Sequence, residues 1–346
     1  MHRVAIIRGD GIGPEISEAT VRVLGASGAK LTWVEVPMGQ EGRRLFGSEL
    51  PWSSLETVRR LGTALKAPLV AERCCGGVVV EAPGEVRRYP SVNNGLRREL
   101  GAYANVRPVR GFAGVSGRYQ HLDLVLVREV TEDTYAGLER QPEQGRAEAT
   151  KLITQEASRR IARFACEYAI RHGRRKITAV HKANVLHLTD GLFLESVRAV
   201  TAEYPSLVFQ DRMVDATCYL LVRHPQDFDV LVLPNQYGDI LSDLAAALVG
   251  SLGLAPGVNF GNGVAVFEAA HGAAPDIAGR GLANPVALIL SGALLLEYLG
   301  EAEAAGRVRR AVAAVLAEGR FLTPDLGGRA TTAELTQAIC ERMDSV

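Results

Sequence analysis

Two aspartates with helical spacing are the strongest chemical signal in the sequence. Asp239 and Asp243 follow a short apolar stretch and lie four positions apart. On a helix this spacing places both carboxylates on one face, where they can share a hard divalent cation such as Mg²⁺ or Mn²⁺. Asp215 stands among apolar residues, where an unpaired charge is costly, and we interpret it as a third ligand. The alternative for the pair is an exposed helix start, at which the helix dipole favours acidic side chains.

Lys182 is the candidate base. It directly follows apolar residues 177–180, and the carboxyl end of a strand is where α/β proteins tend to place their sites. Lysine is scarce in this chain, and an ammonium that can lose its proton does chemistry that a guanidinium cannot. A lysine that only keeps its charged head in water at a strand end is the alternative. Tyr135 could donate a proton, although an isolated tyrosine is more often part of the core.

Three arginines suit an acidic substrate. Arg128 closes an apolar strand and Arg107 precedes a proline in an extended segment, so both side chains project from stiff backbone. Arg97 comes shortly before them in the chain. Each guanidinium can bind one carboxylate through two hydrogen bonds, so the set indicates a small molecule with two or three carboxylates.

Composition limits the possible classes of protein. The chain has 346 residues, of which 39 are Lys or Arg, 39 are Asp or Glu and 47% are hydrophobic. This is ordinary for a folded protein of about two domains, and a net charge of zero argues against binding to nucleic acid or membrane surfaces. The five cysteines form no C-x-x-C pair, so we expect reduced thiols. The first apolar run, residues 1–7, is too short for a signal segment, and we expect a cytoplasmic protein.

The expected elements alternate between strands and helices, which is typical of the α/β class. Strands are expected at residues 4–7, 31–36, 122–127, 177–180 and 230–233, and helices at residues 15–24, 53–61, 147–172, 190–203, 240–252, 285–299 and 302–318. We interpret residues 70–94, rich in glycine, proline and small residues, as a long surface loop. Gly9, Gly11 and Gly13 favour a structural turn over a dinucleotide-binding turn, because Pro14 occupies the position of the required third glycine.

Six motifs in one order give the chain a family resemblance. They occupy residues 9–15, 103–108, 127–137, 181–184, 238–243 and 268–285. Together they resemble the β-decarboxylating dehydrogenases, the family of isocitrate, homoisocitrate and 3-isopropylmalate dehydrogenases, over nearly the whole chain. The resemblance implies two α/β domains, distinct from the Rossmann fold, with the active site in the cleft between them. It implies a large cofactor-binding domain from residues 1–98 and 244–346, and a small domain from residues 99–243 that carries the dimer interface.

The resemblance also implies an activity and a role for each candidate residue. Members of the family oxidise a 2-hydroxy acid by hydride transfer to a nicotinamide, and a divalent metal assists as CO₂ leaves. By similarity Lys182 takes the hydroxyl proton with help from Asp215, and Tyr135 reprotonates the enolate. The implied metal ligands are Asp215, Asp239 and Asp243, and the implied carboxylate-binding residues are Arg97, Arg107 and Arg128. In the family the matching lysine and first aspartate reach across from a neighbouring subunit, which implies a homodimer with shared active sites.

The resemblance places the cofactor in a late segment of the chain and not on the glycine turn. The implied cofactor-binding residues are Asn184, Glu268, His271, Gly272, Asp276, Ile277 and Asn284. His271 and Asn284 would flank the adenine. Members that use NADP carry basic and aromatic residues at the positions of Asp276 and Ile277, and an aspartate there repels a phosphate, which favours NAD.

Substrate choice in the family depends largely on the segment before Arg97. Ser91 and Asn93 match the pattern of isocitrate-using members, whose serine and asparagine bind the third carboxylate of the substrate. Alkylmalate-using members carry apolar residues there, because a hydrocarbon arm would leave polar groups unpaired. The main hypothesis is therefore an NAD-dependent dehydrogenase of isocitrate or a close tricarboxylate analogue. A homoisocitrate or 3-isopropylmalate type, a specialised biosynthetic member and a non-catalytic regulatory subunit are the alternatives.

Three departures from the isocitrate-using pattern support the specialised alternative. Val70 and Ala71 replace the hydroxyl residues expected there, and Ala273 replaces the usual serine or threonine. Residues 66–91 also form a longer segment than is usual in isocitrate-using members, closer to the alkylmalate length. None of these changes touches the expected metal, base or acid positions.

Overall fold

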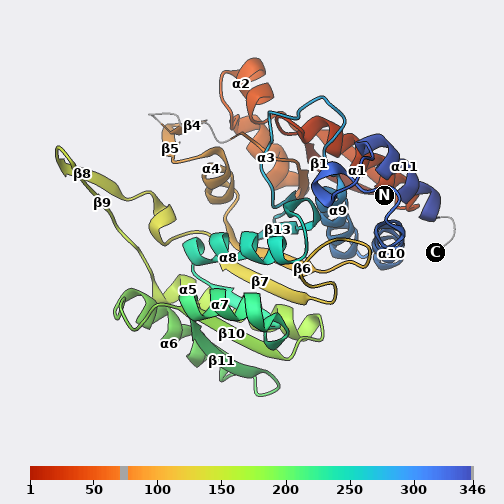
Figure 1. Ribbon diagram of the computed structural model, residues 1–346. Helices are drawn as coiled ribbons and strands as arrows, with labels where there is room; N and C mark the ends of the chain where they lie inside the picture. Colours follow the sequence, from red (N-terminus) through yellow and green to blue (C-terminus); the bar gives the residue numbers. More distant parts are fainter. Residues whose placement is uncertain (71–76, 344–346) are drawn as a thin grey trace. The chain divides into compact units, whose positions relative to one another are not determined.

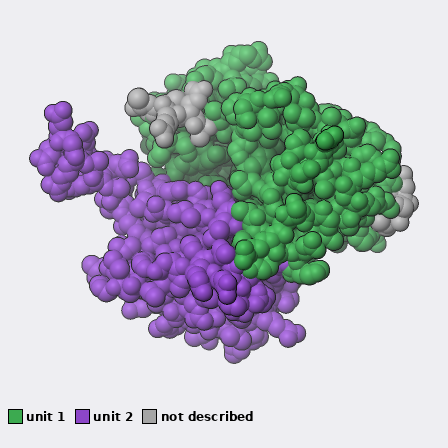
Figure 2. All heavy atoms as spheres, in the orientation of Figure 1, with its two compact units in different colours: residues 1–101, 110–121, 246–346 green, residues 102–109, 122–245 purple. Residues whose placement is uncertain are grey.

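A computed structural model describes residues 1–70 and 77–343 of the chain (Figure 1). The chain divides into two compact units, which Figure 2 colours separately. Unit 1 contains residues 1–101, 110–121 and 246–346, and unit 2 contains residues 102–109 and 122–245. Residues 110–121, which the sequence hypothesis assigned to the small domain, thus pack with unit 1.

Unit 1 is built on strands in the order β13-β14-β3-β1-β2. These are β1 (His2–Ile7), β2 (Leu31–Glu35), β3 (Thr63–Lys66), β13 (Pro256–Gly261) and β14 (Ala265–Ala269). β1 pairs in parallel with β2 and β3, and β14 pairs in parallel with β3 but antiparallel with β13. The last four residues of β1 are fully buried, as expected for a parallel strand covered on both faces.

The helices of unit 1 bury two apolar cores. The first core gathers α1 (Gly13–Ala26), α9 (Val286–Tyr298), α10 (Ala302–Glu318) and α11 (Thr332–Met343). Nearly every residue of α9 is buried, which is typical of a central helix that is apolar on all sides. The second core gathers α3 (Trp52–Leu61), α4 (Val92–Glu99) and the antiparallel hairpin of β4 (Val78–Ala82) and β5 (Glu85–Tyr89). Unit 1 also contains α2 (Gln40–Phe46) and the 3-10 turns η3 (Leu252–Leu254) and η4 (Pro324–Leu326).

Unit 2 contains strands in the order β11-β10-β12-β7-β6. These are β6 (Ala102–Arg110), β7 (Asp123–Glu129), β10 (Lys176–His181), β11 (Val208–Met213) and β12 (Val230–Leu233). β10 pairs in parallel with β11 and β12, and β12 pairs in parallel with β7. Parallel pairing brings the carboxyl ends of these strands to one edge, which is where open α/β sheets bind their ligands.

The remaining elements of unit 2 surround this sheet. α5 (Gln155–Arg171) and α6 (Thr189–Thr201) pack against each other and against its strands. α7 (Val214–Arg223) follows β11, and α8 (Asn235–Leu248) follows β12. The 3-10 turns are η1 (Thr134–Ala136) and η2 (Pro225–Asp227). β8 (Glu139–Glu143) and β9 (Arg146–Ala149) form an antiparallel hairpin, drawn in Figure 1 as a long two-stranded arm.

The α/β class expected from the sequence is confirmed, but two local expectations are wrong. Residues 70–94 are not one long loop, because they contain the β4–β5 hairpin, turning at Gly84, and the start of α4. The helix expected at residues 147–172 begins only at Gln155, where the Thr154 side chain accepts a hydrogen bond from the Ala157 backbone N–H at 3.2 Å.

The cysteines within the described ranges, Cys166, Cys218 and Cys340, carry free thiols. Ala71, Cys74 and Cys75 lie outside the described residues. None of the helices in the described part of the chain combines the length and apolar character that crossing a membrane requires.

Candidate active site

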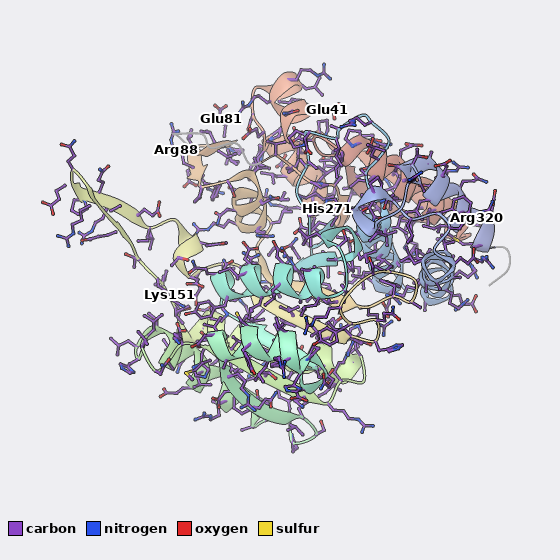
Figure 3. All side chains as sticks on the ribbon, in the orientation of Figure 1. Glu41, Glu81, Arg88, Lys151, His271 and Arg320 are labelled. Carbon is purple, nitrogen blue, oxygen red and sulfur yellow. The ribbon has the colours of Figure 1, made fainter. Side chains whose placement is uncertain are left out.

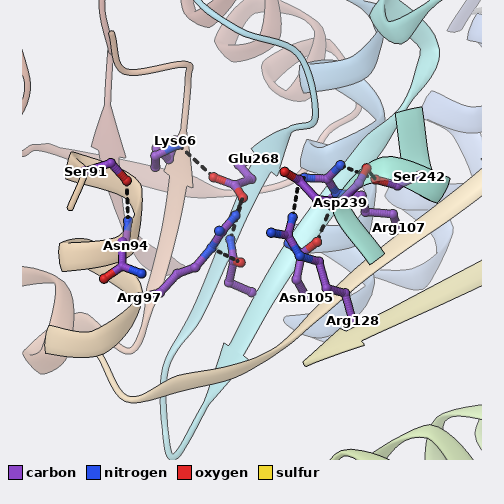
Figure 4. Close-up of polar contacts among 12 residues, drawn as sticks. Lys66, Ser91, Asn94, Arg97, Asn105, Arg107, Arg128, Asp239, Ser242 and Glu268 are labelled. Atoms are coloured by element: carbon purple, nitrogen blue, oxygen red, sulfur yellow. Dashed lines mark hydrogen bonds and ion pairs between the residues drawn. The ribbon is translucent and has the colours of Figure 1, made fainter. Parts of the chain in front are cut away.

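Two buried arginines from neighbouring strands of unit 2 meet the acidic face of α8. Arg128, at the end of β7, forms an ion pair with Asp239 and donates from Nε and Nη2 to Asn235 Oδ1 at 3.0 and 2.7 Å. Arg107 on β6 lies with Nη1 3.4 Å from Asp243 Oδ1 and Nη2 3.8 Å from Asp239 Oδ1. The close-up in Figure 4 shows both guanidinium groups at α8. The structure thus brings together four of the predicted residues.

One glycine makes this close approach possible. A Cβ atom at Gly238 would lie 2.5 Å from Cγ of Arg128, a distance that real Cβ atoms do not show. Arg107 is held in turn by Asn105, whose Oδ1 accepts from Nε at 3.0 Å, and by the hydroxyl of Ser242 at 2.5 Å. Both arginines are therefore preorganised by neighbouring side chains for which the sequence predicted no role of their own.

Asp239 and Asp243 lie on one face of α8, as their spacing predicted. Both carboxylates remain partly accessible, and hard oxygen ligands of this kind suit Mg²⁺ or Mn²⁺. Burial raises the pKa of Asp243, Arg107 lowers it and the nearby Asp239 raises it further. Within the described residues of one chain, no group of three or more His, Cys, Asp or Glu side chains could hold a metal ion. The α8 pair thus fits as part of a metal site that needs a further ligand.

Asp215 is not buried, which corrects the reason for which it was singled out. Its side chain is 63% exposed in the first turn of α7, because its apolar sequence neighbours do not form a core around it: the buried residues of this helix are Thr217 and Leu221. Its carboxylate lies 2.9 Å from Lys182 Nζ, and the hydrogen bond from this lysine lowers the pKa of Asp215. The predicted base and its predicted helper are therefore paired, with both groups partly accessible.

Lys182 is positioned by its backbone as well as by Asp215. It follows β10, and its N–H donates to Oδ2 of the fully buried Asp190 at 2.6 Å. Asn184, expected to contact the cofactor, is exposed just beyond it in unit 2.

Tyr135 lies on the turn η1 and not in the core. Its hydroxyl donates to Asp239 Oδ2 at 2.9 Å, and the Arg128 guanidinium carbon lies 5.4 Å from the centroid of its ring. Partial burial raises the pKa of Tyr135, and the charge of Asp239 raises it further. The phenol therefore stays protonated near neutral pH, as a proton donor must.

In unit 1, the residues predicted to bind the third carboxylate of the substrate lie at the start of α4. Ser91 caps the helix, since its Oγ accepts from Asn94 N at 3.2 Å. Oδ1 of Asn93 is buried and has no hydrogen-bond partner within the described residues. Because the two ends of an amide are exchanged by a flip, this side chain can present a donor or an acceptor to a ligand.

Arg97 on α4 belongs to a buried charge network that the sequence did not reveal. Its Nη2 lies 3.2 Å from Glu268 Oε1, and its Nε donates to Asn259 Oδ1 at 3.0 Å. Lys66 Nζ lies 2.7 Å from the other oxygen of Glu268. Burial alone would raise the pKa of Glu268, but the charges of Lys66 and Arg97 hold it well below its usual range. One net positive charge therefore remains in this network for an acidic ligand.

A cavity of about 290 Å³ in unit 1 contains several of the predicted cofactor residues. Its lining includes His271, Gly272, Ile277 and Asn284. Ile12 and Leu282 add apolar side chains to the cavity wall. His271, labelled in Figure 3, has a buried Nε2 without a partner among the described residues, and burial lowers the pKa of its ring. A mostly apolar cavity with an unpaired ring nitrogen fits a planar heterocycle such as adenine.

Besides Asn184, two predicted cofactor residues lie outside this cavity lining. Asp276 is exposed on the same segment, and Glu268 is occupied by Lys66 and Arg97. Lys66 could have been recognised as a candidate from the sequence, because it is one of few lysines and ends an apolar strand. Asn259 and Asn235 could not have been recognised, because asparagines outside a motif do not stand out in a sequence. Asn105 lies in the motif at residues 103–108, but the motif predicted no role for it.

These observations define an α/β protein whose unit 2 carries arginines, acids and a paired lysine, and whose unit 1 contains a nucleotide-sized cavity. Residues 3–339 match the family model described as isocitrate/isopropylmalate dehydrogenase, and the chain belongs to this family, as the sequence motifs indicated.

Relatives with assigned names agree with this membership. An Arabidopsis thaliana protein named mitochondrial isocitrate dehydrogenase [NAD] catalytic subunit 5 is 46% identical over 97% of this chain and 87% of its own length. A chloroplastic 3-isopropylmalate dehydrogenase of Solanum tuberosum is 43% identical over 92% of this chain and 86% of its own. The crystal structure of isocitrate dehydrogenase from Methylococcus capsulatus superimposes with a TM-score of 0.91, at 45% identity and 99% coverage of both chains.

Proposed function

We propose that the chain catalyses the NAD-dependent oxidative decarboxylation of isocitrate or a close tricarboxylate analogue. The observation that carries the proposal is the set of held arginines, Arg97, Arg107 and Arg128, each of which can bind a carboxylate. Ser91, the N-cap of α4, and Asn93 in its first turn add polar groups that suit a third carboxylate. The names of the Arabidopsis and Methylococcus relatives support the same substrate.

The side chains then divide the proton transfers between them. Lys182 accepts the proton of the substrate hydroxyl, and Asp215, 2.9 Å from its Nζ, orients it and balances its charge. Tyr135 donates the proton that the substrate carbon gains after CO₂ has left. A divalent metal held by Asp239 and Asp243 with Asp215 would polarise the hydroxyl oxygen and the ketone formed from it.

NAD is the proposed cofactor. The relatives' names support it, and the cavity around His271 and Asn284 supports binding of its adenine half. The exposed Asp276 would repel the additional phosphate of NADP.

A homodimer with shared active sites is part of the proposal. The family resemblance assigns Lys182 and Asp215 to the neighbouring copy, and α8 offers only two acids for the metal. Apolar side chains are exposed around these residues, with Tyr219 on α7 at 63% and Ile240 on α8 at 56%. A second copy that covers α7 and α8 would bury them and complete the ligand set.

The cytoplasmic location stays a prediction, and the Arabidopsis relative is named as mitochondrial. Cell fractionation of the source organism tests it.

Formation of NADH by the purified protein tests the activity. Isocitrate, homoisocitrate and 3-isopropylmalate are compared with NAD and with NADP, each with Mg²⁺ and with Mn²⁺. We expect the highest kcat/KM with isocitrate and NAD. No turnover of any of the three acids by a folded, metal-loaded protein would contradict the proposal and favour the specialised or the regulatory alternative.

A double variant tests whether Ser91 and Asn93 bind the third carboxylate of the substrate. The double variant Ser91→Ala/Asn93→Ala is expected to lower kcat/KM for isocitrate by about 100-fold, since two lost polar contacts each cost roughly 1–3 kcal/mol. The value for 3-isopropylmalate should change much less. Ser53→Ala, an exposed serine on α3, is the control. Equal losses with both acids would favour a 3-isopropylmalate type and a purely structural role for Ser91.

A further inference from the structure

Asp133 has a backbone conformation that is essentially restricted to glycine. Its φ of 74° and ψ of −160° lie in a region that L side chains rarely adopt, and its side chain is fully buried. Such a residue persists only where the surrounding contacts hold it, and strained residues of this kind gather at functional sites. Asp133 stands two positions before Tyr135.

The carboxylate of Asp133 joins the turn of Tyr135 to the first turn of α8. Oδ1 accepts from the N–H of Thr134 at 2.8 Å, and Oδ2 accepts from the N–H of Gln236 at 2.9 Å. The hydroxyl of Thr134 adds a bond of 3.2 Å to Gln236 Oε1. A carboxylate at the amino end of α8 is also favoured by the helix dipole. The segment that carries the proposed proton donor is thus tied to the helix that carries Asp239.

A largely buried lysine balances the charge of this carboxylate. Nζ of Lys151, labelled in Figure 3, lies 3.7 Å from Asp133 Oδ1 and 2.7 Å from Asp190 Oδ1. It also lies 4.2 Å from the centroid of the Tyr237 ring. Asp190 accepts the backbone N–H of Lys182 through its other oxygen, so the same cluster contacts the segment of the proposed base.

We propose that Asp133 is a positioning residue that holds the phenol of Tyr135 in place for proton transfer. The inference rests on the proposed function, in which the Tyr135 O–H bond breaks, a C–H bond forms on the substrate and solvent reprotonates the phenolate. The Tyr135 side chain is 37% exposed, so packing alone does not fix it. Its turn, anchored by Asp133, and the 2.9 Å bond to Asp239 define where the hydroxyl lies.

Asp133→Gly separates positioning from folding. Glycine adopts this backbone conformation without strain but removes both carboxylate hydrogen bonds. We expect a protein with an unchanged or only slightly lower melting temperature whose kcat falls about 100-fold, with little change in KM for NAD. Asp133→Asn keeps the side-chain volume and one acceptor oxygen, and we expect a partial loss of about ten-fold.

The matched control is Asp229→Asn. Asp229 also accepts two backbone N–H groups, from Arg175 at 2.7 Å and Lys176 at 3.1 Å, but it has no contact with Tyr135. Its kcat should remain that of the wild type. Full kcat in Asp133→Gly, or the same loss in the control, would overturn the proposal.

A double variant asks whether Asp133 acts through Tyr135. If it does, adding Asp133→Gly to Tyr135→Phe lowers kcat little further, because the group being positioned is already absent. Losses that multiply would overturn the proposal.

If the wild type turns over none of the acids, the proposed function is wrong. The positioning role of Asp133 can then still be tested by crystallography. Crystal structures of the wild type and of Asp133→Gly then compare the distance from Tyr135 Oη to Asp239 Oδ2. Separation beyond hydrogen-bond reach in the variant supports the role, and an unchanged distance overturns it.

Discussion

Mixed dimers of two inactive variants should recover activity if the active sites are shared. Lys182 and Asp215 are paired at 2.9 Å within one chain, and Tyr135 and Asp239 are paired at 2.9 Å within one chain. In a shared site, the first pair comes from one copy and the second pair from the other. Lys182→Met and Asp239→Asn therefore damage opposite halves of each site.

The expected magnitude follows from counting sites. In the mixed dimer both defects fall in the same site, and the second site is intact. Dimers of known composition are obtained by co-expressing the variants with two different tags and purifying on both. They should show about half of the wild-type kcat per dimer, against near-zero activity for either variant alone.

The control combines two variants on the same half of the site. In a mixed dimer of Lys182→Met and Asp215→Asn, one site lacks the base and the other lacks its partner, so no site is intact. We expect no recovery. Failure of the Lys182→Met/Asp239→Asn dimer to recover activity would show that each site is built from one chain and would refute the shared-site reasoning.

Three further predictions concern single residues. Gly238→Ala should lower the melting temperature and kcat together, because its Cβ would lie 2.5 Å from Arg128 Cγ and overpacking costs about 1–3 kcal/mol; thermal unfolding and NADH assays measure both. Burial raises the pKa of Glu132 to about 7 from 4.5, so the native state binds more protons and stability falls as pH rises through this window. In the variant Glu132→Gln the melting temperature should fall less steeply between pH 4.5 and 7 than in the wild type. An equal dependence of melting temperature on pH in both proteins would contradict this prediction. Lys66→Met leaves Arg97 as the cationic partner of Glu268, so KM for the tricarboxylate should rise about ten-fold while KM for NAD stays within two-fold.

Local spacing made part of the candidate site predictable. Asp239 and Asp243 share a face of α8 because i and i+4 positions do so on any helix. Lys182 and Arg128 lie at strand ends because apolar runs and the residues that close them can be recognised in the sequence. For Asp215 the apolar neighbours were misleading, because most of α7 is not buried within this chain and the side chain of Asp215 is exposed.

The fold was predicted less evenly. Long helices such as α10 (Ala302–Glu318) agree with their expected bounds because many apolar positions repeat with helical period. The β4–β5 hairpin was missed because its short strands lie in a stretch dense in glycine and proline, and both residues also occur in hairpin turns. Composition alone therefore does not distinguish a long loop from a hairpin.

Contacts between residues far apart in the chain were not predictable from one sequence. The carboxylate of Glu268 contacts Lys66 and Arg97 from other elements, separated from it by 202 and 171 positions, and its predicted contact with the cofactor stays a prediction. The same applies to Asp133, whose carboxylate accepts a hydrogen bond from Gln236, a residue 103 positions away. An aspartate in a turn predicts a cap for its own neighbours. That it also caps a second helix, and so joins a proposed proton donor to proposed metal ligands, follows only from the fold.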